Sequence, residues 1–529
     1  DVTETVNITV SKVNDDPNGE LIITGPQHVD GKLFALFGVQ DFDGIDQKNI
    51  AYKWYRGDTA ILAETTNTYS LSDSDIGMKI SVEATYTDNE ENTHTVYSDR
   101  TNSISSLEQY TFKNFRINLG YDDNASDPEI VLLTNGGFLA VWNLNSDQSI
   151  VVQQFDSAGL RVGNIFKINQ IETGTQIGTK SAQLSNGDLI TVWYSNDLEE
   201  NRFQHIAQDY DIFFTQYTLE GETKVPAQSI LSNETKDQLE NNIIALTSGG
   251  FAITWVEESD IYLRFFNENG EFETDPILVN TYTNDHQTSP DIELISDNRL
   301  VLVWNSRGQD GDSWGINGQI VDIAGNKVGN EFRINESTFA GQYLPKVSST
   351  TSSNFIVSYT SEDASDEWGT FSTGIYIVGF DESGNQLIPE TRINSFDPNH
   401  QWRSDIAKIS DEHYVLVWES QLQDDDIWGI YAQVISSSGE LIGSEVKVSD
   451  DKAVNYYPTV RGLSNGDYLV AWTTYNEGSE KREIYAQRYD IDGNSVPYHN
   501  PPPTFSTLQA EKIFEDEHFS KIFEVTDTE

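Results

Sequence analysis

Three loops carry the same short pattern of an Asp, any residue, a Trp and a Gly. They span residues 312–315, 366–369 and 426–429. Clustered Asp carboxylates on a loop that contains Gly can supply the six to eight oxygen ligands that Ca²⁺ takes. The alternative is an acidic turn that only faces solvent, and no loop has the full EF-hand pattern. The sequence therefore predicts calcium ligands in these loops, at Asp310, Asp312, Asp366, Asp424, Asp425 and Asp426.

The Trp residues of this pattern suggest a second kind of site. Aromatic rings offer flat apolar faces on which a sugar ring can stack, while nearby carboxylates or calcium hold its hydroxyl groups. The alternative is that these Trp side chains pack between repeats, where Gly lets the backbone come close. Three further aromatic residues lie in loops that join one repeat to the next. The predicted ligand-binding set is Trp314, Trp368, Trp428, Trp402, Tyr456 and Tyr457.

Motifs of catalysis are scarce. The eight His residues are scattered without zinc spacing. No GxSxG, P-loop or GxGxxG stands between a strand and a helix, and the Asp-box of sialidases, SxDxGxxW, is missing. We therefore expect a protein that is not an enzyme, although an acidic surface always offers carboxylate pairs that could hydrolyse glycosides.

A repeated hairpin positions these loops. The stretch 128–142 reads as two strands around an Asn-Gly turn, and six more copies follow at intervals of about 50 to 60 residues. Each copy continues with a polar loop, a third strand, a Gly turn and a fourth strand such as FRIN at 332–335. The hairpins end at Trp142, Trp193, Trp255, Trp304, Tyr359, Trp418 and Trp472.

The last copy lacks a fourth strand, and an unattached FRIN at 115–118 precedes the first copy. An N-terminal strand that completes the last sheet would close a ring and leave no exposed terminal sheet. We therefore predict an all-β fold with a seven-bladed β-propeller of four-stranded blades at residues 109–500. The alternative is an open stack of sheets with capping repeats. Long acidic loops on one face of the ring predict that a partner binds there.

The flanks read as β-sandwich modules. Residues 1–17 form the end of a preceding sandwich and a junction, and 18–108 an immunoglobulin-like sandwich around Trp54. Residues 501–529 form a linker and the start of a cadherin-like module. The alternative is that this tail pairs with residues 1–13 in a split domain. Asp41, Asp43 and Asp46 are a further calcium candidate, with a polar turn as the alternative.

Composition excludes several partners. Lys and Arg total 32 against 85 Asp and Glu, a net charge of −53, which argues against nucleic acid and anionic membrane surfaces. The absence of Cys excludes disulfides and thiolate metal sites. No apolar run is long enough for a membrane span. Any signal peptide or secretion signal would lie outside residues 1–529.

The junction VNDDP (13–17), the sandwich end SDSDIGMKISVEATYTD (72–88), the tail IFEDEHFSKIFEVTD (513–527) and the ring motif around DxWG and FRIN resemble modules of very large bacterial surface adhesins of the RTX type. The resemblance implies type I secretion, an extracellular location on the bacterial surface, bound calcium and neighbouring extender domains in the same chain. It also implies a calcium junction at Asn14, Asp15 and Asp16.

These observations lead to one expectation and two alternatives. We expect a calcium-dependent ligand-binding segment of an adhesin, whose propeller recognises a carbohydrate or protein on another cell or substratum. A structural spacer in the adhesin stalk is one alternative. A polysaccharide-degrading propeller enzyme is the other.

Overall fold

The chain divides into two compact units, 1–111 with 499–529 and 112–498. In the computed structural model, residues 21–104 and 115–496 are described, with internal gaps. The gaps are 25–31, 38, 40–49, 62–64, 89–91, 102, 119–124, 145–148, 158, 160, 170–174, 197–209, 232–235, 351, 366–370, 397–398, 424–426, 450–452 and 477–480. Within the described residues, no helix has the length and apolar content to cross a membrane.

The first unit contains two small sheets that share one hydrophobic cluster, centred on the buried Trp54. Buried Asp75 links the two sheets, because it accepts hydrogen bonds from Arg56 at 2.6 Å and from the Tyr69 hydroxyl at 2.9 Å, and these two residues lie in different sheets. The immunoglobulin-like type of this unit stays a prediction. One sheet has the order β1 (Leu21–Thr24), β2 (Lys32–Phe37), β5 (Thr68–Ser70), and the other β4 (Thr59–Ala60), β3 (Ala51–Arg56), β6 (Ile80–Thr87), β7 (Thr93–Tyr97), with the 3-10 turn η2 at Asp73–Asp75.

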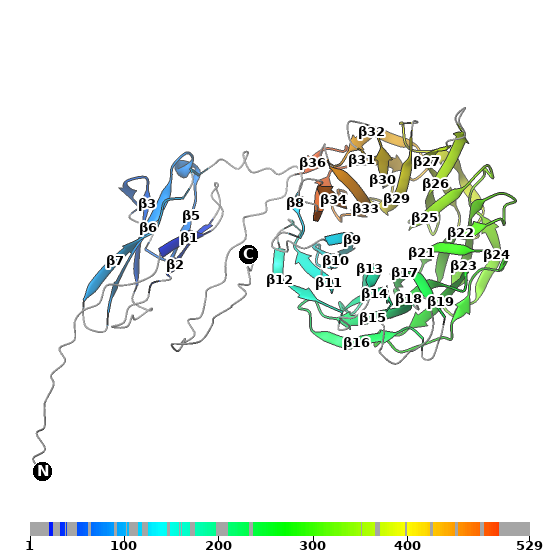
Figure 1. The fold of residues 1–529 in the computed structure, drawn as a ribbon, viewed down its shortest axis with the longest axis horizontal. Coiled ribbons are helices and arrows are strands. Elements are labelled where there is room, and N and C mark those ends of the chain that lie inside the picture. Colours follow the sequence, from blue (N-terminus) through cyan, green and yellow to red (C-terminus); the bar gives the residue numbers. More distant parts are fainter. Residues whose placement is uncertain are drawn as a thin grey trace, which may run out of the picture. The chain divides into compact units, whose positions relative to one another are not determined.

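The second unit is a ring of four-stranded antiparallel blades, seen face-on in Figure 1. Each blade runs outward from the ring axis in chain order. The blades are β9 (Ala125–Leu132), β10 (Phe138–Leu144), β11 (Ser149–Phe155), β12 (Arg161–Lys167); β13 (Gln176–Gln183), β14 (Leu189–Ser195), β15 (Asp211–Tyr217), β16 (Thr223–Ser229); β17 (Gln238–Ala245), β18 (Phe251–Glu257), β19 (Asp260–Phe266), β20 (Ile277–Leu278); β21 (Gln287–Ser296), β22 (Arg299–Arg307), β23 (Trp314–Asp322), β24 (Lys327–Arg333); β25 (Gln342–Ser349), β26 (Phe355–Ser365), β27 (Phe371–Phe380), β28 (Gln386–Arg392); β29 (Gln401–Lys408), β30 (His413–Gln421), β31 (Trp428–Ser436), β32 (Leu441–Lys447); and β33 (Val454–Gly462), β34 (Tyr468–Asn476), β35 (Lys481–Tyr489), β36 (Ser495–Val496). The predicted all-β chain is confirmed, and the first five blades are separate four-stranded sheets. The strands of the last two blades form one nine-stranded sheet, because β31 and β33 share one parallel pair and both β36 and β8 pair with β35, so the last copy has a short fourth strand of its own beside the N-terminal one.

The ring closes through a strand from before the first blade. Strand β8 (Phe115–Arg116) pairs with β35 of the last blade, and the Ile117 N–H donates to the Ile484 carbonyl at 2.8 Å. The Ile484 N–H in turn donates to the side-chain oxygen of Asn118 at 3.2 Å. The Asn of FRIN plays the same part elsewhere, since Asn335 accepts from Ile316 N at 2.7 Å. An Asn at the end of the outer strand accepts from the third strand in five blades, at Asn118, Asn169, Asn280, Asn335 and Asn394. Ser449 does so in blade six, whereas in blade two the Ile212 N–H donates to Gln238.

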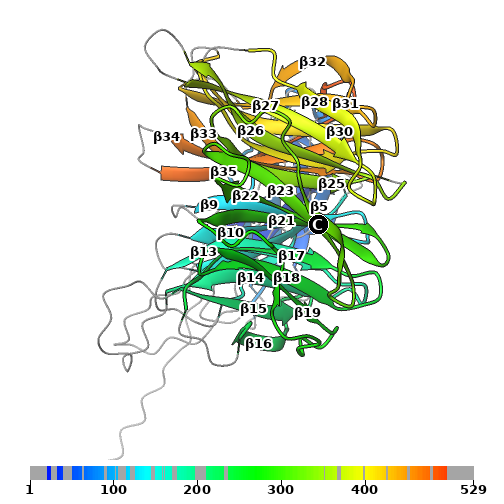
Figure 2. The same ribbon diagram turned by 90° about the vertical axis from the view of Figure 1, so that its right-hand side faces the viewer.

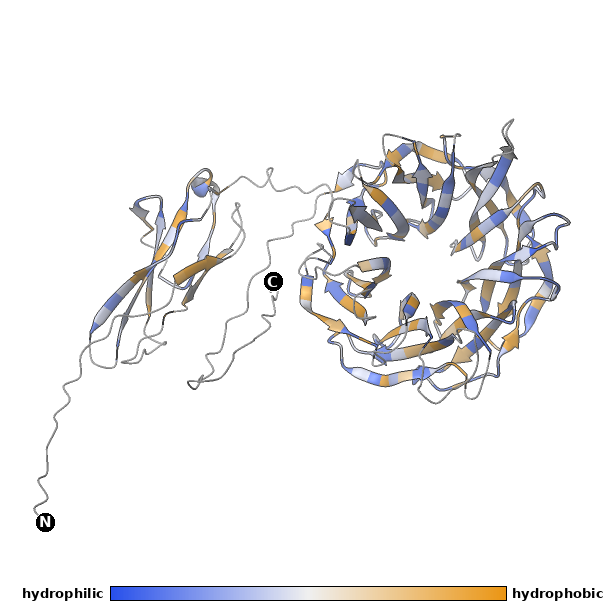
Figure 3. Ribbon diagram, viewed as in Figure 1, coloured by the Kyte–Doolittle hydropathy of each residue, from blue (hydrophilic) through white to orange (hydrophobic). Residues whose placement is uncertain are grey.

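Hydrophobic clusters fill the spaces between neighbouring blades. The β-branched and aromatic residues of the strands alternate with polar ones, as Figure 3 shows for the ring strands. The predicted ends of the second strands lie within these strands, which continue at least two residues further. The side chains at these positions are at most 1% exposed, so these rings are structural: Trp142, Trp193, Trp255, Trp304, Tyr359, Trp418 and Trp472. Burial of such rings supplies most of the packing energy of each blade interface.

All seven first strands share one backbone irregularity. Each has a register shift against its second strand, and the bulge contains a residue in the left-handed region with φ between 50° and 66°. Six of these residues are not Gly, although only Gly adopts this conformation without strain. The seven residues are Asp127, Gly178, Glu240, Ser289, Leu344, Arg403 and Tyr457. Figure 2 shows several of the first strands from the side of the ring.

Candidate active site in the central channel

The residue two places after each bulge residue faces the ring axis. Because the register is the same in every blade, this position pairs with the residue before the Trp or Tyr of the second strand. Most of the side chains at this position are charged, which is unusual for innermost strands. They are Glu129, Lys180, Asn242, Asp291, Lys346, Asp405 and Thr459.

Four of the channel side chains form one ion-paired chain across the ring closure. Glu129 accepts from Lys180 Nζ at 2.8 Å and from Arg461 at 2.6 Å. The same Arg461 guanidinium contacts Asp405 at 3.0 Å. Asp405 also accepts from the Thr459 hydroxyl at 3.0 Å and the Val460 N–H at 2.9 Å. The side chains of blades one, two, six and seven are therefore tied together at the axis.

A second chain joins the next three blades. Asp291 accepts from Lys346 Nζ at 3.2 Å, from the Val347 N–H at 2.8 Å and from the Asn242 amide at 2.5 Å. Two residues further along the same strand, Glu293 accepts from the Ser349 hydroxyl at 2.7 Å. Among the described residues, Glu293 forms no ion pair, in contrast to Glu129, Asp291 and Asp405.

The channel carboxyls differ in their proton affinity, and ion pairing alone does not decide it, because burial outweighs Lys346 at Asp291 and raises the Asp291 pKa. Burial opposes ionisation of Glu129, but Lys180 and Arg461 outweigh it and hold the Glu129 pKa below its usual range. Arg461 and Lys346 likewise outweigh burial at Asp405 and lower its pKa. Burial raises the pKa of Glu293 to about 7, and neighbouring Asp291 adds to this rise against the hydrogen bonds from Ser349. The channel thus holds ionised carboxylates beside a carboxyl that is protonated in mildly acidic solution.

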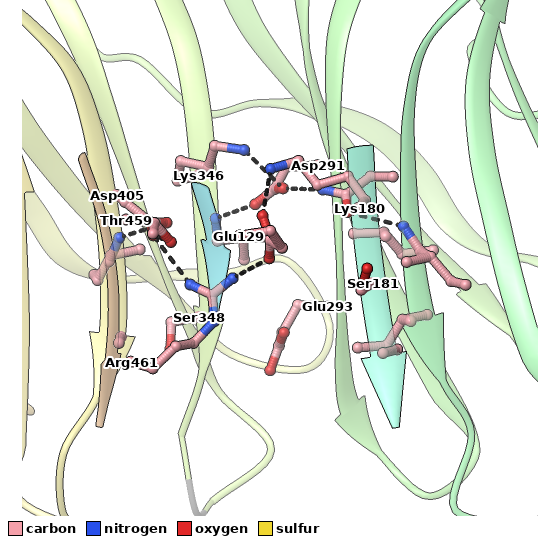
Figure 4. A pocket seen from close by; sticks show the side chains of 18 of the residues that line it. Glu129, Lys180, Ser181, Asp291, Glu293, Lys346, Ser348, Asp405, Thr459 and Arg461 are labelled. Atoms are coloured by element: carbon pink, nitrogen blue, oxygen red, sulfur yellow. Dashed lines mark hydrogen bonds and ion pairs between the residues drawn. The ribbon is translucent and has the colours of Figure 1, made fainter. Parts of the chain in front are cut away.

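These groups line one cavity of about 680 Å³ that runs from the bulge residues to the level of Glu293. Figure 4 shows the ion pairs and Glu293 pointing into this space. The volume is typical of small-molecule sites. Five acidic residues (Asp127, Glu129, Asp291, Glu293, Asp405) and five basic residues (Lys180, Lys346, Arg403, Lys408, Arg461) are among its lining. The channel is therefore balanced in charge, whereas the whole chain is strongly acidic.

The mouth of the channel is aromatic. A second cavity of about 240 Å³ is lined by Arg403, Tyr456, Tyr457, Thr473, Tyr475 and Arg482. The Arg403 guanidinium stands over the Tyr457 ring at 4.7 Å and lies 3.6 Å from the carboxylate of Glu419. Arg403 and Tyr457 are both bulge residues, and both also line the larger cavity. The bulge thus presents their side chains at the point where the two cavities meet.

The structure brings together part of the predicted ligand-binding set. Tyr456 and Tyr457 lie at the mouth, with ring centroids 6.2 Å apart. Trp402 is half-buried beside Tyr343, at 5.5 Å between ring centroids. Trp314 and Trp428 are half-buried at the starts of β23 and β31 and line neither cavity. The carbonyl oxygen of Trp428 accepts from Asn455 of the next blade at 3.3 Å.

Two predicted calcium ligands are described, and both make hydrogen bonds to neighbouring chain segments. Asp310 accepts from the Asn335 amide at 3.2 Å, and a Cβ on Gly315 would lie 2.6 Å from the Asp310 carboxylate. A side chain at this Gly of the DxWG copy would therefore displace the Asp310 carboxylate. Asp312 accepts from the Ala340 N–H at 3.1 Å.

Within the described part of the chain, no group of three acidic or His residues is placed to hold a metal ion. Calcium binding stays a prediction. The other predicted site residues lie outside the described residues: Asp366, Trp368, Asp424, Asp425, Asp426, Asn14, Asp15, Asp16, Asp41, Asp43 and Asp46.

Sequence reasoning missed the channel residues. Glu129, Asp291, Lys346 and Asp405 lie on different first strands, about 50 to 60 residues apart in the sequence, so no local motif joins them. A signal was present in the repeat itself. With the seven copies aligned on their second-strand Trp or Tyr, a charged or amide residue recurs at one position of six first strands.

No family model and no curated protein matches the chain. Solved structures with a similar fold include a protein of unknown function from Dyadobacter fermentans, 12% identical, covering 72% of this chain and 98% of that chain, with a TM-score of 0.44. The polysaccharide lyase Uly1 is 9% identical over 73% of this chain and 96% of its own, with a TM-score of 0.45. The NanB sialidase of Streptococcus pneumoniae is 10% identical over 91% and 94%, with a TM-score of 0.40.

Two predictions are corrected here. We expected an adhesin segment and a protein that is not an enzyme, whereas the similar solved structures of named activity include polysaccharide lyases, arabinanases, an arabinofuranosidase and sialidases. Both predictions are contradicted. Their physical weakness was that they weighed the outer loops and missing local motifs, while the buried ionisable groups come from strands far apart in the sequence. The RTX resemblance and the extracellular location stay predictions.

Proposed function

We propose that the propeller is an enzyme that hydrolyses glycosidic bonds of a polysaccharide in its central channel. One observation carries this proposal. A single cavity contains a carboxyl with a pKa of about 7, Glu293, together with ion-paired carboxylates at Glu129 and Asp405 whose pKa values are lowered. Carboxyl groups whose environments drive their pKa values apart are the acid and base pair that glycoside hydrolysis requires.

In this proposal, Glu293 acts as the general acid. Its proton passes to the glycosidic oxygen as the bond to the anomeric carbon breaks, and the leaving sugar departs as an alcohol. The developing positive charge on the sugar ring is stabilised by an ionised carboxylate, for which Asp405 and Glu129 are the candidates. A water molecule then adds to the anomeric carbon and gives its proton to the Glu293 carboxylate, which restores the acid. Hydrogen bonds from Thr459, Val460 and Arg461 hold Asp405 ionised and fixed in position. Such fixed charges need no reorganisation when the charge develops.

The mouth would bind sugar rings beyond the cleaved bond. Tyr456, Tyr457 and Tyr475 lie at the blade seven side of the mouth, and Trp402 lies in β29 of blade six. Aromatic faces of this kind support stacking with flat apolar surfaces. A cavity that continues from these rings to Glu293 would bring the next glycosidic bond toward the acid.

The alternative role of the channel groups is structural, because the ion pairs tie neighbouring blades together. The two roles are separated by incubating the protein with a panel of purified neutral, uronate-containing and sulfated polysaccharides. We expect new reducing ends from at least one of them, without the unsaturated sugar that a lyase would leave. No new reducing ends from any member of the panel would leave only the structural role.

A further inference from the structure

The small cavity at the mouth has an unusual composition for this chain. Acidic residues outnumber basic ones by 85 to 32 overall, yet the described lining of this cavity contains two Arg, three Tyr, one Thr and no carboxylate. Its volume of about 240 Å³ leaves room for a single ring and its substituents. From this composition and position, we infer that this cavity is a subsite for an anionic sugar, in which arginine binds the carboxylate or sulfate group.

The two Arg residues come from different blades and reach the same space. Arg403 is the bulge residue of β29, and Arg482 lies near the start of β35. Arg482 pairs in register with Tyr475 of β34, so its side chain begins at the level of the Tyr475 ring. Guanidinium groups match the planar, bidentate geometry of carboxylate and sulfate oxygens. Two of them lining one cavity favour a bound anion.

Arg403 is held in place by its surroundings. Its guanidinium stacks over Tyr457, and the buried Glu419 lies 3.6 Å away. Glu419 also accepts the Tyr457 N–H at 2.8 Å. One carboxylate therefore orients both bulge residues. A guanidinium has five N–H donors, so this single ion pair leaves donors for a ligand.

The backbone supports a function for these side chains. Arg403 has φ of 50° and Tyr457 has φ of 53°, a conformation that costs a residue with a Cβ on the order of 1 kcal/mol or more. Gly178 shows that Gly is accepted at the equivalent position of blade two. The bulge is common to all seven blades, so what distinguishes Arg403 and Tyr457 is that their side chains line the small cavity.

The Tyr rings complete the subsite. Tyr456 and Tyr457 lie 6.2 Å apart at an interplanar angle of 49°, so they form two walls rather than a single flat platform. A sugar ring could stack on one wall while its charged substituent reaches the Arg residues. The subsite continues into the channel, because Arg403 and Tyr457 line both cavities. As a substrate subsite, this inference rests on the proposed hydrolase function, and it narrows the substrate to a polysaccharide with uronic acid or sulfate groups.

Binding of three oligosaccharides of equal length tests the subsite: an oligogalacturonate, a sulfated galactan oligosaccharide and a neutral galactan oligosaccharide. The full chain with Glu293→Gln prevents turnover during calorimetry. We expect at least one anionic probe to bind about 10-fold or more tighter than the neutral one, and Arg482→Gln and Arg403→Gln each to weaken it by about 10-fold. The two anionic probes distinguish a carboxylate from a sulfate. Arg333→Gln, on an exposed outer strand, is the matched control and should leave binding unchanged.

Equal binding of all three probes, no binding, or unchanged affinity in Arg482→Gln would overturn the subsite. Arg482 is exposed, so this variant is expected to fold even if Arg403→Gln does not. Failure of the subsite and failure of the hydrolase are distinguishable. Release of reducing ends from neutral polysaccharides only would contradict the anionic subsite and support the hydrolase. Arg-dependent binding of an anionic probe without cleavage of any polysaccharide would support an anion-binding site and contradict the hydrolase.

Discussion

Arg461 and Glu129 are 332 residues apart in the sequence, and their side chains meet at 2.6 Å where the last blade joins the first. The same guanidinium contacts Asp405 of blade six at 3.0 Å. This one residue therefore couples the closure of the ring to the ionisation of two carboxylates in the channel. Ring closure and the candidate active site share the same contacts.

Replacing Arg461 by Met should lower both stability and activity. The change leaves Glu129, which is 5% exposed, with Lys180 as its remaining cationic partner, and it removes the ion pair of Asp405. Breaking a buried pair costs about 3 to 5 kcal/mol. The Arg461 side chain is 30% exposed to channel water, so we expect a smaller loss of about 2 to 3 kcal/mol in the free energy of unfolding, measured in urea.

The exposed Arg307, which pairs with Asp285 at 3.6 Å, gives the matched control. Arg307→Met should cost less than about 1 kcal/mol. Equal losses in the two variants would show that the channel ion pairs stabilise the fold no more than an exposed ion pair does.

The closing strand should matter more than its length suggests. Ile117 is fully buried in the cluster between the first and last blades, with Ala471 and Ile484 on the opposite side. Ile117→Ala should lower the free energy of unfolding by about 2 to 5 kcal/mol, because it leaves a cavity at the only described junction closed by a strand from before the first blade. Chemical denaturation measures this loss. Leu441→Ala, at a site 51% exposed, should have almost no effect, and a similar effect of the two changes would contradict the closure.

The stability of the chain should depend on pH through Glu293. Its pKa is about 7 in the folded state against an ordinary value of 4.5, so the folded state binds the proton more tightly than the unfolded state. The stabilising contribution is therefore complete below about pH 4.5 and is lost as pH rises through 7. Because water reaches the channel, we expect a loss on the order of 1 to 2 kcal/mol.

Glu293→Gln isolates this contribution, since Gln resembles the protonated carboxyl and does not ionise. Its melting temperature relative to the unchanged protein should be higher at pH 8 than at pH 5. The exposed Glu220→Gln serves as the control and should show no such difference. The same offset at both pH values would mean that Glu293 titrates in its ordinary range.

The fold was predictable because its signals are local and repeated. Asn-Gly turns, Trp near the end of second strands and the Asn of FRIN each act within one blade, and the displaced FRIN at 115–118 indicated the closing strand before any contact was known. Each such signal fixes hydrogen bonds between residues close in the sequence, as Asn335 does for Ile316. Each signal alone is a weak indication of a strand or a turn, but its recurrence in seven copies made the prediction of the repeated fold reliable.

The candidate site was not predictable in the same way. Its partners, such as Glu129 and Arg461, are brought together only by closure of the ring, and each one alone is a single charge in a strand. The outer loops were predicted as the binding site because their acidic residues are adjacent in the sequence. Ionisable groups that are spread one to a blade become a site only when the blades meet at an axis.

Reducing-end release from a cleaved polysaccharide, measured for the unchanged protein, Glu293→Gln and Glu220→Gln across pH, tests the central claim most directly. We expect Glu293→Gln to lower the turnover rate by about 100-fold or more while Glu220→Gln leaves it unchanged. We also expect the rate of the unchanged protein to fall as pH rises through about 7, where Glu293 loses its proton. Full activity of Glu293→Gln on that polysaccharide would contradict the assignment of the channel as the active site.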